Sequence, residues 1–154
     1  MIQRIQSIFI LLSIIATALM FNIPFASIYH PDAGIFILKA TGLYQFVQEQ
    51  EILQSAIYPL LIIISITLFF QVVSLFLYKK RILQIRFCTF SILFHLGILI
   101  MAIYYVYQAT SNNNATTQYG FSLILPVIAV IMNYLASRYI MKDEKLIKSL
   151  NRLR

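Results

Sequence analysis

Charged residues are scarce in this chain. Only 11% of its 154 residues are Asp, Glu, Lys or Arg, whereas about a quarter of the residues in a soluble domain are charged. The few charges stand in short clusters between long apolar runs, and 60% of all residues are hydrophobic. Such a chain cannot cover a surface in water, so the composition predicts an integral membrane protein.

Cysteine is nearly absent as well. Cys88 is the only one, which excludes a disulfide framework and a cysteine-rich zinc site. His30, Asp32, Glu49 and Glu51 are the only grouped residues that could bind a metal, and they lack the tight spacing of a metal motif. We therefore expect no metal and no other cofactor.

Four apolar runs are each long enough to cross the roughly 30 Å hydrocarbon layer of a bilayer as a helix. They cover residues 5–25, 56–78, 87–107 and 119–141. Pro59 falls in the opening turn of the second run, whereas Pro126 falls inside the fourth and predicts a bend there. The predicted fold class is an all-α membrane protein, a single domain over 1–154 built as a four-transmembrane-helix bundle.

Lys and Arg are distributed very unevenly over the ends of these runs. Lys39 alone falls on one side of the predicted bundle, and the remaining positive residues fall on the other. Because Lys and Arg in short loops are retained in the cytoplasm, this asymmetry predicts that both termini are cytoplasmic. The net charge of +7 therefore indicates topology, and we expect no nucleic-acid partner.

Two connecting segments have structure-forming patterns of their own. Gly34–Leu38 and Gly42–Val47 are β-prone runs that predict a small β-hairpin in the first extracytoplasmic loop. In the tail 142–154, apolar and basic residues alternate at helical spacing, which predicts an amphipathic cytoplasmic helix that lies on lipid or docks a partner. Candidate docking or lipid-surface residues are Lys79, Lys80, Arg81, Arg86, Lys145, Lys148, Arg152 and Arg154.

Polar side chains within the predicted spans are the best pointers to a site, because they are costly in lipid. Ser13, Gln71, His95 and Asn133 each lie roughly 10 to 13 Å from the cytoplasmic end of their span, at 1.5 Å per residue. This candidate intramembrane polar layer has two interpretations. It stabilises helix packing by hydrogen bonds, or it surrounds a proton or ligand site at His95.

The chain resembles an uncharacterised family of Bacteroidota membrane proteins, domain of unknown function 4293. The resemblance is carried by the opening Met1–Ser7, by Leu125–Arg138, and by the charged ending with Asp143-Glu144 and Arg152-Leu153-Arg154. Asn151 stands where the family usually has Asp. The resemblance covers the whole length and implies a bacterial inner-membrane location, with no activity, cofactor or site residue to carry over.

No reactive constellation accompanies these features, so we expect a protein without enzymatic activity. The leading hypothesis is a small accessory or assembly subunit of a larger inner-membrane complex, with other membrane subunits or further copies as partners and an anionic inner leaflet beneath it. The alternative is a small oligomeric transporter or channel whose polar layer surrounds His95. A lipid-modifying enzyme based on His30 and Asp32 ranks last, because this pair lacks an activating partner.

Overall fold

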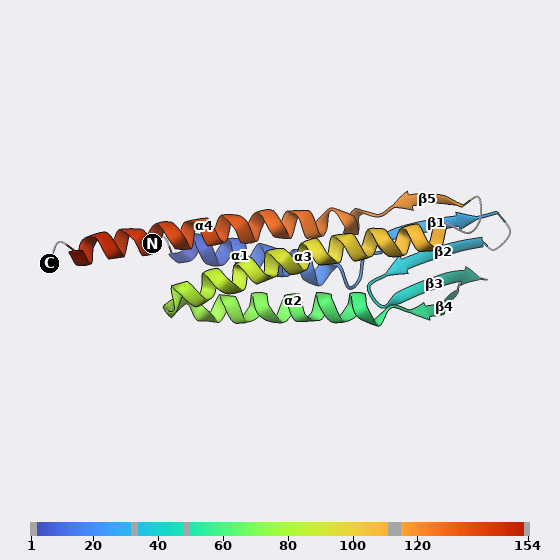
Figure 1. Cartoon of the computed structure of the whole chain (residues 1–154). Coiled ribbons are helices and arrows are strands. Elements are labelled where there is room, and N and C mark those ends of the chain that lie inside the picture. Colours follow the sequence, from blue (N-terminus) through green and yellow to red (C-terminus); the bar gives the residue numbers. More distant parts are fainter. Residues whose placement is uncertain (1–2, 32–33, 48–49, 111–114, 153–154) are drawn as a thin grey trace.

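The computed structural model describes residues 3–31, 34–47, 50–110 and 115–152. It contains four helices that run side by side and a β-sheet beyond one end of them (Figure 1). The helices are α1 (Gln3–Leu19), α2 (Tyr58–Phe76), α3 (Arg81–Thr110) and α4 (Leu125–Arg152), with one-turn 3₁₀ helices at η1 (Leu77–Lys79) and η2 (Phe121–Leu123). Both ends of the described chain lie at the end of the helices opposite the sheet (Figure 1).

The sheet has five antiparallel strands in the order β4-β3-β2-β1-β5. Their bounds are β1 (Ala26–His30), β2 (Gly34–Lys39), β3 (Gly42–Val47), β4 (Gln50–Ala56) and β5 (Thr116–Tyr119). β2 and β3 form the hairpin expected from the sequence, with Lys39 opposite Gly42 and a two-residue turn between them. The all-α fold class is nevertheless wrong, because the hairpin is only the centre of a sheet that joins two loops far apart in the sequence.

Within the described residues, three helical segments are long and apolar enough to cross a membrane: Tyr58–Phe76, Arg81–Thr110 and Phe121–Leu146. The prediction of four full-length spans is wrong for the first run. α1 has 17 residues and rises only about 25 Å, and the chain turns at Met20–Ile23 before β1. Phe25 and Ala26 are apolar because they are buried between the sheet and the helices, not because they face lipid.

The fourth predicted run also begins later than expected. β5 and η2 occupy its first residues, so Pro126 stands in the opening turn of α4, where no helical hydrogen bond requires its nitrogen. The predicted bend inside a span is therefore wrong. At its other end α4 continues without a break into the predicted tail helix, as far as Arg152.

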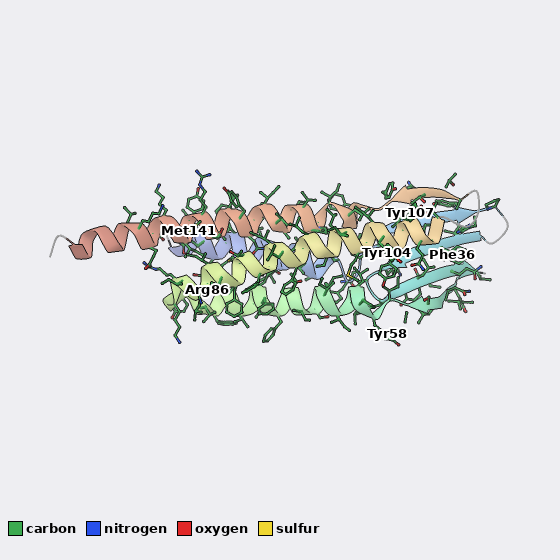
Figure 2. The ribbon with its side chains drawn as sticks, viewed as in Figure 1. Phe36, Tyr58, Arg86, Tyr104, Tyr107 and Met141 are labelled. Carbon is green, nitrogen blue, oxygen red and sulfur yellow. The ribbon has the colours of Figure 1, made fainter. Side chains whose placement is uncertain are left out.

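The sheet and the helices share one hydrophobic core. The last turns of α3 pack on β1 and β5, and Ala102 and Val106 lie in the same buried cluster as Phe25 and Leu38. Tyr58, Tyr104 and Tyr107 mark this junction in Figure 2, whereas Arg86 and Met141 lie toward the opposite end of the helices. The sheet is thus fixed to the helices by packing as well as by its connections.

Candidate intramembrane polar site

All four residues of the predicted polar layer meet in one place, near the middle of the helices. Ser13 comes from α1, Gln71 from α2, His95 from α3 and Asn133 from α4, and none exposes more than 1% of its surface. The structure adds a fifth member, Thr17, one turn after Ser13 on α1 and equally buried. We call these five residues the polar cluster.

Ser13 is the centre of one half of the cluster. Its Oγ accepts hydrogen bonds from Gln71 Nε2 and from Asn133 Nδ2, each at 2.6 Å, and it donates to the backbone carbonyl of Ala129 at 3.3 Å. Asn133 Nδ2 also donates to that carbonyl at 2.9 Å. A hydroxyl from α1 thereby connects α2 with α4.

Thr17 and His95 form the other half. Thr17 Oγ1 lies 3.0 Å from His95 Nε2 and 2.9 Å from Gln71 Oε1, so it joins α1, α2 and α3. The second ring nitrogen, His95 Nδ1, lies 2.6 Å from the backbone carbonyl of Ser91. Both ring nitrogens therefore have partners, and the ring is held in one orientation.

The distance between Thr17 and His95 matches that of a catalytic nucleophile and its base, but the surroundings of the pair do not. A hydroxyl 3.0 Å from an imidazole nitrogen is typical of nucleophilic catalysis. Here, however, Thr17 and His95 have no exposed surface, and a backbone carbonyl takes the place of the acidic partner. The groove of about 80 Å³ beside His95, between α3 and α4, is otherwise lined by apolar side chains such as Leu99 and Val130. This arrangement favours a structural role, in which hydrogen bonds hold the helices together, over a catalytic one.

Comparison with protein families shows the family to which the chain belongs. The model of the domain of unknown function DUF4293 matches residues 2–153, nearly the whole sequence. The chain belongs to the DUF4293 family. No curated protein matches it.

The basic residues of this DUF4293 chain gather at the end of the helices away from the sheet. Lys80, Arg86 and Lys145 are exposed, and Arg81 Nη1 lies 4.0 Å from Glu144 Oε2 on α4. The side chains of three further predicted docking residues, Lys79, Lys148 and Arg152, fall outside the described part of the structure, as does the whole of Arg154. Asp32 and Glu49 also lie outside the described residues.

The sequence did not indicate a second buried polar contact at this end. Gln6 on α1 donates a hydrogen bond from Nε2 to Asp143 on α4, and both side chains are buried. Asp143 stands between Lys142 and Glu144, so its immediate neighbours do not mark it as buried. Helical spacing could have placed it correctly, because it lies one or two turns after the buried residues Ala136 and Ile140.

Proposed function

We propose that this DUF4293 protein is a non-catalytic accessory or assembly subunit of a larger bacterial inner-membrane complex, and that it binds a partner subunit along strand β4. The observation that carries the proposal is the open edge of the sheet at β4. This strand has β3 on one side and no strand on the other within the described chain.

β4 has few of the features with which proteins usually protect a sheet edge, although its pairing with β3 shifts register between Leu43 and Tyr44. It contains no proline, six of its seven residues are exposed, and its one charged residue, Glu51, forms an ion pair with Lys39. Ile52 and Leu53, which are adjacent and so point to opposite faces, are 49% and 50% exposed. An exposed apolar edge with free backbone groups is the surface to which an added strand binds.

Apolar exposure continues from the end of β3 onto this edge. Phe46 and Val47 are 42% and 38% exposed, and they pair with Glu51 and Gln50 of β4. The polar cluster, in contrast, is buried and hydrogen-bonded among the four helices. The polar cluster therefore offers no surface to a partner, whereas the sheet does.

The charge distribution supports an orientation for this complex. Lys39 is the only Lys or Arg in the strands, and all others stand in the helices or at their ends away from the sheet. With both termini in the cytoplasm, the sheet faces the extracytoplasmic side, and the basic end faces the anionic inner leaflet. We therefore expect the partner at β4 to be extracytoplasmic or to have an extracytoplasmic segment.

The experiment compares two edge variants in the native membrane. Tagged wild-type protein and the variants Ile52→Lys on β4 and Thr116→Lys on β5 are purified in mild detergent, and co-purifying chains are identified and counted. We expect a partner at fixed stoichiometry with the wild type and with Thr116→Lys, and at least a tenfold loss of that partner with Ile52→Lys.

Thr116→Lys is the matched control, because Thr116 is exposed on the opposite edge strand. A wild-type protein that purifies alone, or a partner retained equally by all three proteins, contradicts the proposal. Equal helical content by circular dichroism shows that Ile52→Lys remains folded.

The alternative function, a small oligomeric transporter or channel around His95, rests on one observation. Asn133 Oδ1 is buried and has no hydrogen-bond partner among the described residues, as expected if it met a transported species. The other polar atoms of the cluster bind one another, and the groove that reaches His95 is otherwise lined by apolar side chains. The accessory-subunit proposal is therefore the better supported one.

A further inference from the structure

A groove of about 770 Å³ runs along the outer face of α4, toward the end opposite the sheet. Its walls include Tyr134, Tyr139 and Met141, together with three cations, Arg138, Lys142 and Lys145. Figure 2 shows Met141 at this end of α4. The groove thus combines an apolar wall with concentrated positive charge.

The three cations point in nearly the same direction. At 100° per residue, Lys142 lies about 40° to one side of Arg138 and Lys145 about 20° to the other, so all three fall within an arc of about 60°. Each is exposed, and no ion pair involves any of them within the described part of the chain. Their charges are therefore available to a ligand.

The acidic neighbours of these cations are turned away from the groove. Asp143 is buried and accepts a hydrogen bond from Gln6 of α1, and Glu144 faces Arg81 of α3. The same helical geometry places both acids at least about 120° from Arg138. The helix thus separates the mixed charges of the sequence into a positive outer face and an inner side that carries both acids.

The groove lies at the depth of the lipid headgroups. No charged residue precedes Arg138 on α4, so this arginine marks the end of the membrane-embedded part of the helix. Tyr134, one turn deeper, is 53% exposed, and tyrosine prefers the boundary between acyl chains and headgroups. A ligand in the groove would therefore meet cations at its polar end and apolar side chains at its other end.

We propose that Arg138, Lys142 and Lys145 bind the phosphate headgroup of one anionic phospholipid, whose acyl chains lie along α4 beside Tyr134. The arginine guanidinium offers paired donors to the phosphate oxygens, and the two lysines supply point charges on either side. The site does not depend on partner binding at β4, because it lies at the opposite end of the molecule.

The test is a lipid titration of the full-length detergent-solubilised protein followed by native mass spectrometry. The probes are phosphatidylglycerol and phosphatidylcholine with identical acyl chains. We expect one phosphatidylglycerol to bind in preference to phosphatidylcholine. Each of Arg138→Gln, Lys142→Gln and Lys145→Gln should weaken phosphatidylglycerol binding about fivefold, the usual effect of one interfacial cation.

Arg86→Gln is the matched control. Arg86 is an exposed cation on α3 outside the groove. It lies two residues from Cys88, which packs with Ala136 and Ile140 of α4, so Arg86 lies at about the depth of Arg138. Unchanged affinity for this variant supports a defined site. An equal loss with Arg86→Gln, no loss with the α4 variants, or equal binding of phosphatidylcholine would overturn the proposal. Competition by glycerol phosphate at the lipid's own concentration would also overturn it, because the acyl chains would then contribute nothing.

Discussion

The Thr17 hydroxyl has one proton and three neighbours that can accept it. These are His95 Nε2 at 3.0 Å, Gln71 Oε1 at 2.9 Å and the backbone carbonyl of Ser13 at 2.9 Å. His95 Nδ1 faces the Ser91 carbonyl, which can only accept, so the proton of a neutral ring lies on Nδ1 and Nε2 needs a donor. That donor is Thr17, and it can then give nothing to Gln71.

The orientation of the Gln71 amide is therefore linked to the proton on His95. With both ring nitrogens protonated, Nε2 donates to Thr17, Thr17 donates to Gln71 Oε1, and Gln71 Nε2 donates to Ser13. With a neutral ring, the amide must turn by half a rotation so that its nitrogen faces Thr17 and its oxygen accepts from Ser13. A change of charge at one side chain thus requires a rotation at another.

Replacement of Thr17 by valine tests how much the cluster stabilises the helices. Thr17→Val keeps the shape of the side chain but leaves His95 Nε2 without a partner, so we expect the free energy of unfolding in detergent to fall by about 1 kcal/mol. Thr67→Val is the control, because the buried Thr67 hydroxyl bonds only the backbone carbonyl of Ile63 on its own helix. Equal losses in the two variants would show that the contacts between helices add nothing.

Depth along each helix was sufficient to place the polar layer from the sequence. Counting residues from the basic ends brought Ser13, Gln71, His95 and Asn133 to one level, and the structure joins them by hydrogen bonds. Thr17, four residues after Ser13, was not part of the predicted layer. That spacing places both hydroxyls on one side of α1, and only the position of Gln71 shows that the side is polar.

Among the elements, the junction between β5 and η2 holds Gly120, which has the closest backbone neighbours of the four glycines. A Cβ at Gly120 would lie 2.3 Å from the carbonyl oxygen of Pro24 and 3.0 Å from that of Phe25. Gly120 N also donates to the Phe25 carbonyl at 2.8 Å. The loop after α1 and the strand before α4 are thus pressed together at a position where only glycine fits.

Alanine at Gly120 should therefore destabilise the junction, because backbone atoms cannot move aside as side chains can. We expect the thermal unfolding midpoint of Gly120→Ala to fall, at a cost of about 1–3 kcal/mol. Gly97→Ala provides the comparison, since its Cβ would meet only the end of the Ile63 side chain at 3.1 Å and alanine favours the helix. A midpoint for Gly120→Ala at or above that of Gly97→Ala would contradict this account.

Local patterns were sufficient for the hairpin of β2 and β3 but not for the rest of the sheet. β1 (Ala26–His30) falls in the loop after the first predicted span, 5–25, and was not predicted as a strand, and β5 has only four residues, Thr116–Tyr119, which are too few for a pattern. β4 has no clean alternation because both of its faces are exposed. The pairing of β1 with β5 joins segments on either side of α2 and α3, and no local signal can show it.

The whole molecule is divided into an uncharged helical middle, a sheet at one end and a basic region at the other. This polarity predicts the orientation in the membrane, which cysteine labelling in intact cells can measure. Gln54→Cys on exposed β4 should react with a membrane-impermeant maleimide, whereas exposed Lys80→Cys, between α2 and α3, should react only after permeabilisation. Native Cys88 is fully buried and gives the unlabelled background. The reverse labelling pattern would show that the protein has the opposite orientation in the membrane.

The strand order also sets the sequence of events by which the sheet is completed. Synthesis from the N-terminus yields β1 through β4 in succession, and these four can pair as soon as Ala56 has emerged. β5 follows only after α2 and α3, so β1 remains an unpaired edge while two long hydrophobic helices are being inserted. Closure of this large loop makes the pairing of β1 with β5 a late step of folding. Until then the open edges of the nascent sheet are β4 and β1, whereas those of the finished sheet are β4 and β5.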